Sequence, residues 1–320
     1  MRNKKGAMDI SFGWIFAVVV GAFILFLTIY GVIKFVNLQK TSISSESARS
    51  IGVLTNPLET SFETAKRGMI ITGAETRIYT NCSNASIFGK QILRTSEKSY
   101  DKWGEGSVDA TFQNKYIFSN DPVEGKKFYA FSKPLEFPFK VADLIYLTST
   151  TDKYCFINPP NDIRDEINDL RGEDVSKDEN FFVTTKKIDC PAVSTSICFS
   201  GETGCDVSVR RNWNTLQKKG QRPVYFQGDA LMYAAIFSNR DDYECQLDRL
   251  MNRTEQLFEI YSDKSKFVLN KTGCNSELDV QFIQMLTLIK GFQDSNDLST
   301  IYDLAEQMGN INEYAECKLW

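Results

Sequence analysis

The longest apolar run of the sequence lies near its start. From Ile10 to Ile33, 24 residues follow one another without a charged side chain. A helix of this length covers about 36 Å at about 1.5 Å per residue, which is enough to cross a bilayer core of about 30 Å. Trp14 and Tyr30 stand near its two ends, where aromatic rings favour the membrane interface. The pattern predicts a transmembrane helix over 10–33, rather than a buried core helix or a cleaved secretory signal, whose apolar part is shorter.

Beyond this helix the pattern changes twice. Apolar positions recur at helical spacing through 34–54, and Asn56-Pro57 can end one helix and begin a shorter one that closes at Gly68. We therefore expect juxtamembrane helices over 34–68. From 69 to 228 short aromatic and β-branched runs alternate with turn residues. They predict strands at 76–80, 115–118, 127–131 and 144–148, with one helix near 161–170.

From Gly228 onward the apolar period becomes 3.6 residues. It predicts helices over 229–237, 241–261, 278–289 and 298–315. The last helix carries an apolar stripe: Leu298, Ile301, Ala305, Met308, Ile311 and Ala315. The segment 278–289 is apolar on nearly every side, so we expect it to be the most buried. The fold class predicted is α+β: an N-terminal transmembrane helix, a β-rich middle region over 69–228 and a C-terminal helical bundle over 229–320.

The cysteines indicate on which side of the membrane the folded part lies. All eight follow the apolar helix: Cys82, Cys155, Cys190, Cys198, Cys205, Cys245, Cys274 and Cys317. No Cys-x-x-Cys pair occurs and the chain has no histidine, so the usual ligands of a zinc site are missing. An even number of cysteines favours a disulfide framework, and therefore an oxidising compartment. We expect a single-pass cell-membrane protein with residues 1–9 in the cytoplasm and the rest outside; the pairing stays open, although Cys317 can reach Cys245 or Cys274.

Composition narrows the possible functions. The chain contains no histidine, so catalysis by a serine or cysteine that an imidazole activates is excluded. We also expect no metal and no cofactor. The net charge is −4, and the first nine residues carry three basic side chains against one acid, so the remainder carries −6. An acidic domain argues against nucleic acid as a partner, because binding to phosphates needs a basic face. The partner that the sequence does predict is the lipid bilayer.

The N-terminal sequence KKGAMDISFGWIF resembles the class III signal peptide of archaeal type IV pilin-like and archaellin precursors. Lys4, Lys5 and Gly6 match the basic stretch that ends in glycine. The resemblance implies cleavage after Gly6, with Ala7 as the new N-terminus, and a helix used in a filament core or as an assembly anchor. It covers about the first 35 residues. In such precursors an acid stands five positions after the cut, whereas here that position is Ser11 and the acid is Asp9. An ordinary signal anchor is the alternative.

Other motifs are less specific. Four Asn-x-Ser/Thr sequons are candidate glycosylation sites: Asn81, Asn84, Asn252 and Asn270. One basic cluster could bind an anionic polymer or lipid headgroups, although a solvated loop between strands explains it more simply; it comprises Arg210, Arg211, Lys218, Lys219 and Arg222. Ser99-x-x-Lys102 and Lys271-Thr272-Gly273 match short motifs of penicillin-recognising enzymes, but the Ser-Asp-Asn triplet is missing, so we interpret both as coincidental. Acids near Asp162 form no calcium loop.

Three functions remain open. The first is a structural or surface-assembly protein, pilin-like in its anchor, that associates with itself or with other surface proteins. The second is a signal-anchored binding module, an adhesin or a receptor for a polymer or a protein. The third is an enzyme that uses carboxylates, which would need a pair of them in a cleft; the sequence alone favours a protein that is not an enzyme.

Overall fold

The computed structural model describes residues 13–32, 34, 67–104, 106, 108–171, 180–199 and 204–320. Among these residues, one helix, Gly13–Val32, is long and apolar enough to cross a membrane, and its side chains are exposed along its whole length. It agrees with the predicted helix over 10–33. The helices predicted over 34–68 lie outside the described residues except at their end, where the prediction is wrong: Gly68 belongs to a strand, since β1 (Arg67–Ser83) is already paired there.

A seven-stranded sheet forms the centre of the folded head. Its order is β3-β2-β1-β6-β7-β5, with β4 paired to β2. The strands are β1, β2 (Lys90–Ser99), β3 (Lys102–Trp103), β4 (Ala110–Phe112), β5 (Tyr116–Phe118), β6 (Val123–Glu136) and β7 (Lys140–Ser149). Every pairing is antiparallel except that of β5 with β7. The four runs predicted as strands all lie in it; β5 begins one residue after the start of its run, at Tyr116.

The sheet curls until strands from its two sides meet. The side chain of Gln91 on β2 accepts a hydrogen bond from the N–H of Ile117 on the edge strand β5, at 3.0 Å. Gln246, from the long helix α4 (Arg240–Thr272), donates to the same Gln91 oxygen at 2.6 Å and so closes the seam. A separate small core is enclosed within the curled sheet, with side chains from five strands such as Ile78, Leu93 and Phe128. Burial on both faces explains why β5, β6 and β7 are apolar at consecutive positions.

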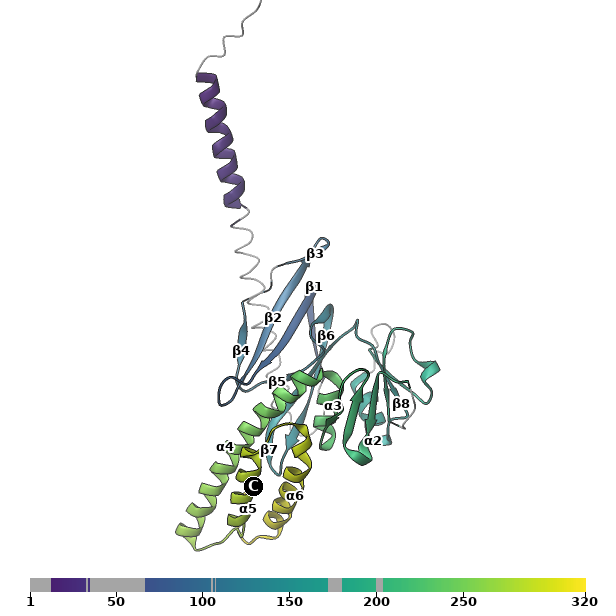
Figure 1. Cartoon of the computed structure of the whole chain (residues 1–320), viewed down its shortest axis with the longest axis vertical. Helices are drawn as coiled ribbons and strands as arrows, with labels where there is room; N and C mark the ends of the chain where they lie inside the picture. Colours follow the sequence, from purple (N-terminus) through teal and green to yellow (C-terminus); the bar gives the residue numbers. More distant parts are fainter. Residues whose placement is uncertain are drawn as a thin grey trace, which may run out of the picture.

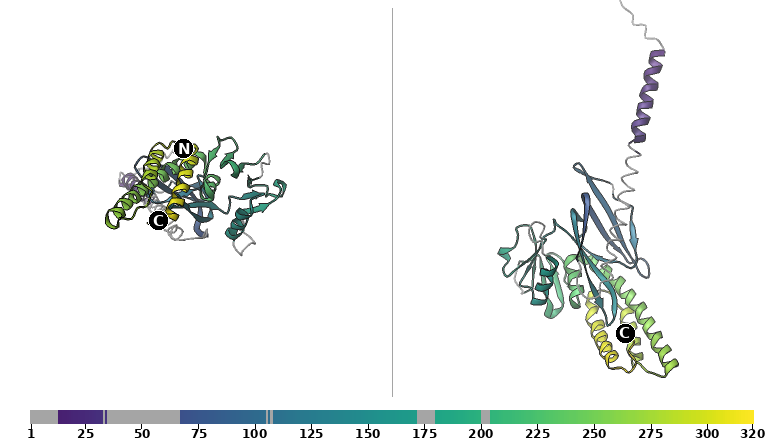
Figure 2. Two further views of the ribbon diagram at one scale, coloured as in Figure 1. Left: turned by 90° about the horizontal axis from the view of Figure 1, so that it is seen from below. Right: turned by 180° about the vertical axis from the view of Figure 1, so that it is seen from behind.

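A six-stranded mixed sheet lies beside the first (Figures 1 and 2). Its order is β13-β12-β11-β10-β8-β9, and its strands β8 to β11 run parallel. The elements are β8 (Tyr154–Ile157), α2 (Asn161–Arg171), β9 (Phe181–Thr184), β10 (Thr195–Cys198), β11 (Val207–Arg210), β12 (Thr215–Lys218) and β13 (Val224–Tyr225). The predicted helix near 161–170 is α2, which connects the parallel strands β8 and β9.

The helix α3 (Gly228–Phe237) lies between the two sheets (Figures 1 and 2). Eight of its ten residues are buried, which makes it the most buried helix of the head. Phe131 of β6 is central to this core, since its ring meets Phe181, Tyr233 and Phe237 edge to face at centroid distances of 5.4–6.1 Å. Aromatic pairs of this kind add stability beyond their buried area. They join both sheets to α3 in one continuous core.

Three C-terminal helices form a lobe at the far end of the head: α4, α5 (Asp279–Lys290) and α6 (Leu298–Tyr314) (Figure 1). Their positions agree with the predicted ones, although α4 continues eleven residues beyond 261, to Thr272. The expectation that 278–289 is the most buried helix is wrong. Val280 and Ile283 are 62% and 69% exposed, because α5 packs on α4 and α6 with one side only.

Candidate functional site

The sequence pattern indicated that the residues of the basic cluster share one solvated loop, but in the structure they do not. Arg210 ends β11, Arg211 begins the short helix η3 (Arg211–Trp213) and Lys218 ends β12. Only Lys219 and Arg222 lie in the turn before β13. The loop interpretation fails because β11 and β12 are paired antiparallel strands. Their apolar side chains Val207, Val209 and Leu216 are buried.

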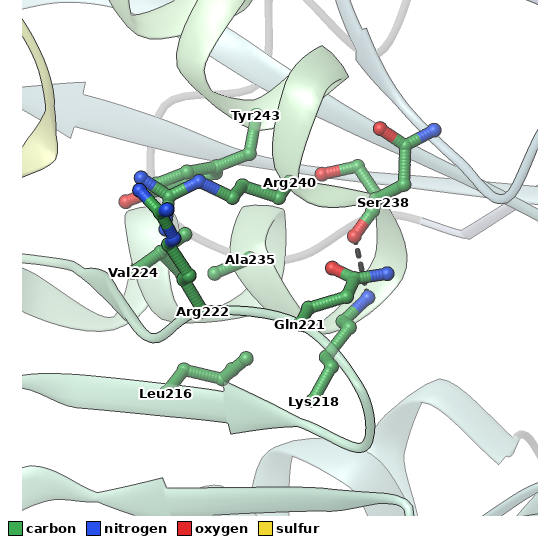
Figure 3. A pocket seen from close by; sticks show the side chains of 10 residues that line it. Leu216, Lys218, Gln221, Arg222, Val224, Ala235, Ser238, Arg240 and Tyr243 are labelled. Atoms are coloured by element: carbon green, nitrogen blue, oxygen red, sulfur yellow. Dashed lines mark hydrogen bonds between the residues drawn. The ribbon is translucent and has the colours of Figure 1, made fainter.

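The Lys218 side chain points inward from β12, and its ammonium caps the C-terminus of the helix α3 (Figure 3). Its ammonium donates to the carbonyl of Ile236 at 2.8 Å and to the carbonyl of Ser238. A cation is stabilised there, because unpaired carbonyls and the helix dipole leave partial negative charge at a helix C-terminus. Burial lowers the pKa of Lys218 to about 8. The residue is thus engaged in holding α3 against β12.

A small hollow of about 10 Å³ lies beside Lys218 (Figure 3). Gln221, Arg222 and Arg240 line it together with apolar side chains of β12, β13 and α3. Arg240 donates to the carbonyl of Pro223 at 2.7 Å, which fixes its guanidinium at the hollow. The volume suits one water molecule or one oxygen of an anion. No local sequence pattern groups Arg240 with Arg222, because Arg240 stands in another element, at the start of α4.

Arg211 belongs to a different group of charges. It donates to Asp162 of α2 at 2.8 Å and to Asp229 of α3 at 3.0 Å. Beside this pair, Glu166 accepts hydrogen bonds from the Lys133 ammonium and from the Tyr233 hydroxyl. Burial and the neighbouring Glu166 carboxylate raise the pKa of Tyr233 far above its ordinary value. These ion pairs connect α2, α3 and β6, so Arg211 has a structural role in this arrangement.

An open polar cleft of about 390 Å³ lies at the start of β8 and β10. Ten residues line it: Asn120, Thr151, Asp152, Lys153, Tyr154, Ala192, Val193, Ser194, Thr195 and Asp206. They come from four separate segments of the chain, so no local pattern in the sequence groups them. Hydroxyl, amide and carboxyl groups of this kind can form hydrogen bonds to a small polar ligand.

The pKa values of two carboxyl groups in the cleft are shifted in opposite directions. Burial raises the pKa of Asp152, although the Ser149 hydroxyl donates to it at 3.0 Å. The N–H and the hydroxyl of Ser196 donate to Asp206 at 2.9 and 2.7 Å, and they lower the pKa of that carboxyl. Asp152 and Asp206 come from different segments that line the same cleft. The described residues contain no group of three Cys, Asp or Glu side chains placed to hold a metal ion.

The chain matches no protein-family profile, no curated protein and no solved structure.

The predicted disulfide framework is confirmed. The four pairs are Cys82–Cys245, Cys155–Cys190, Cys198–Cys205 and Cys274–Cys317. The first joins β1 to α4 beside the seam of the curled sheet, and the next two lie in the six-stranded sheet and its connections. The last ties the C-terminal tail to the segment that follows α4, so Cys317 pairs with Cys274 and not with Cys245.

The four sequons differ in their surroundings. Asn81 on β1 and Asn270 in the last turn of α4 are exposed. Asn84 is exposed as well, but its amide donates to Asp248 at 3.0 Å. Asn252 is half-buried in the middle of α4, where it is the least accessible to a modifying enzyme.

The remaining motifs are placed far apart or outside the described residues. Ser99 and Lys102 pair across the β2–β3 hairpin, whereas Lys271 and Thr272 end α4 and Gly273 follows as its left-handed cap. The hairpin and the end of α4 lie at opposite ends of the head (Figures 1 and 2), so these motifs form no common site. The processing residues Gly6 and Ala7 lie outside the described residues.

Proposed function

We propose that this chain is a single-pass membrane-anchored protein with a structural or surface-assembly role, its N-terminus in the cytoplasm and its head outside the cell. The observation that carries the proposal is the combination of an exposed 20-residue apolar helix with a head whose eight cysteines are all bonded. Disulfides persist in oxidising compartments, which lie outside the cytoplasm. Such a helix favours the bilayer over water because its exposed apolar surface is large.

The outer faces of the C-terminal helices support assembly. Ile260 and Phe267 lie two turns apart on α4, and both are 62% exposed. Val280 and Ile283 are exposed one turn apart on α5. Exposed apolar side chains grouped in this way are typical of protein–protein contact surfaces. We propose that they contact other copies of this chain or other surface proteins.

A charge introduced on this surface tests the assembly role. Ile283→Glu should leave the melting temperature of the full chain nearly unchanged, because the side chain is 69% exposed, and should reduce cross-linked oligomers recovered from the native membrane. Thr185→Glu, at an exposed position just after β9 and outside the C-terminal helices, is the control for added charge alone. Equal oligomer yields from wild type and Ile283→Glu would count against assembly through α5.

The pilin-like form of the proposal concerns the N-terminus. The resemblance around Lys4, Lys5 and Gly6 supports cleavage after Gly6. Mass analysis of the protein from its native membrane should find Ala7 as the first residue, and Gly6→Leu should retain residues 1–6. A wild-type protein that keeps Gly6 would remove the pilin-like form and leave the plain signal anchor.

The polar cleft favours a second candidate function, a surface binding module. Its volume and its hydrogen-bonding groups suit a small hydroxylated ligand such as a sugar. Saturation-transfer NMR with a panel of mono- and disaccharides should then detect binding that Asp152→Asn weakens. If no sugar binds, or if the variant binds as the wild type does, the cleft is not such a site.

A further inference from the structure

Large apolar side chains are exposed at the end of the seven-stranded sheet where β1 begins. Tyr100, at the tip of the β2–β3 hairpin, is 98% exposed. Met69 and Ile71, in the first residues of β1, are 57% and 63% exposed. We call this group, formed by Met69, Ile71 and Tyr100, the hairpin surface. The β2–β3 hairpin lies at the end of the head opposite to the C-terminal helices (Figures 1 and 2).

The sheet register brings the members of the hairpin surface together. Thr76 of β1 pairs with Glu97 of β2, and one residue farther along the Lys98 ammonium lies 3.0 Å from Glu75. Continued past Thr76, where the pairing of β1 with β6 is interrupted, this register places Tyr100 opposite residue 73, two residues from Ile71 and four from Met69. The hairpin itself is held firmly, since the Arg77 guanidinium lies 4.0 Å from the ring centroid of Trp103.

Tyr100 occupies a backbone conformation that does not suit it. Its φ of 56° is left-handed, where asparagine or glycine costs less free energy than an aromatic residue. The side chain makes no compensating packing, because it is almost fully exposed. The left-handed backbone closes the two-residue turn between the paired Ser99 and Lys102, so the unusual feature of this position is the large exposed ring.

The charges around the hairpin surface favour an anionic layer. Lys102, next to the tip, and Lys126, whose carbonyl accepts a hydrogen bond from Thr72, are both exposed. The acids Glu75 and Glu124 are paired with Lys98 and Arg77, while Asp101 remains exposed at the tip. Tyrosine beside lysine is the composition found at membrane interfaces, where the ring enters the headgroup layer and the ammonium contacts phosphate.

We propose that the hairpin surface rests in the lipid headgroup layer of the same membrane that the N-terminal helix spans. This inference rests on the proposed membrane anchoring. Continuity of the chain supports this occupant: the helix ends at Val32, the head begins at Arg67, and the strand that receives the connection carries Met69 and Ile71. The membrane contact would orient the head, with the C-terminal helices directed outward.

Photo-cross-linking of the full chain in vesicles tests the contact. The photoreactive residue p-benzoylphenylalanine replaces Tyr100, Tyr314 or Trp14, one at a time, in protein reconstituted into phosphatidylcholine vesicles with phosphatidylglycerol. Tyr314 is the matched control, because it is also a tyrosine, is 86% exposed and lies in the last turn of α6. We expect about tenfold more lipid adduct at Tyr100 than at Tyr314, because only the first would lie in the headgroup layer.

The Trp14 variant separates the two claims. Lipid adducts at Trp14 and Tyr100 but not at Tyr314 support the inference. Adducts at Trp14 with equal yields at Tyr100 and Tyr314 overturn the inference and leave the anchor intact. If Trp14 gives no lipid adduct, the proposed anchoring fails, and the inference fails with it. Should replacement of Tyr100 lower the melting temperature, the same comparison is made with Ile71, which must give the same result.

Discussion

Single buried polar residues hold the head together where strands meet α4. Arg249 is fully buried, and its guanidinium donates to three loop carbonyls, those of Phe88, Gln113 and Lys115, at 3.0–3.2 Å. Each of these carbonyls would cost about 1–3 kcal/mol if it were buried without a partner. The sequence did not predict this role, because arginines are mostly exposed and the helical pattern directed Leu247 and Leu250 inward.

Gly89 is required by the position of Arg249. Its φ is 57°, and a Cβ there would lie 2.6 Å from Arg249 Cγ and from the carbonyl oxygen of Ser83. We expect Gly89→Ala to destabilise the head by about 2–3 kcal/mol, since left-handed strain and a clash with backbone combine. Thermal unfolding of the full chain in detergent measures the effect. Gly220→Ala is the control: its φ is also positive but its Cβ meets no atom within 4 Å, so a loss as large as that of Gly89→Ala would show that the clash is unimportant.

Asp242 makes stability depend on pH. Burial raises its pKa from 3.8 to about 6. The folded state therefore favours the protonated carboxyl over the ionised one. The stability that this preference contributes is fully present below the unfolded pKa and is lost as pH rises through about 6. Partial exposure and the positive end of α4 limit the loss to about 1 kcal/mol. Asp242→Asn should therefore raise the melting temperature relative to wild type at about pH 7.5 and less so at about pH 4.5; a gain that is the same at both would contradict this assignment.

Among the elements, the sequence pattern predicts type and position well and burial poorly. The four C-terminal helices and the strands β1, β5, β6 and β7 follow from apolar periodicity, whereas the ten-residue strand β2 is not among the predicted runs. The short strands β9 to β13 were not predicted, because each has at most four residues and depends on pairing partners distant in the sequence. That α3 is more buried than α5 depends on which elements surround each helix. The polar cleft depends in the same way on how four separate segments come together. Neither is a property of a local pattern.

The stripe of α6 shows where the pattern succeeds. Leu298, Ile301, Ala305 and Met308 are buried, while Asp303 is exposed on the opposite side. We expect Ile301→Ala to destabilise the head by about 2–5 kcal/mol, because it opens a cavity in a packed core. Asp303→Ala should be nearly neutral. Similar shifts of the denaturation midpoint for both variants would show that the stripe is not the packed face.

The whole molecule consists of an apolar helix, a head of two sheets joined through α3, and a lobe of three helices. Disulfides connect these parts at different ranges: Cys82–Cys245 links β1 to α4 over 163 residues, whereas Cys198–Cys205 closes a connection of 7. In the chain-entropy account a bridge stabilises more when it closes a longer loop. Disulfides stabilise the head only in a compartment where thiols are oxidised. The proposed location of the head outside the cytoplasm and its disulfide bonding therefore have to be tested together.

Alkylation of intact cells tests that claim most directly. Cells are treated with a membrane-impermeant maleimide, with or without a membrane-impermeant phosphine reductant, and the mass of the full chain is measured. The account predicts no modification without reductant, and after it modification of the partly exposed cysteines of two bridges, Cys82–Cys245 and Cys274–Cys317. Cysteines that react without reductant, or that react only after the cells are broken, would contradict a disulfide-bonded head on the outside of the membrane.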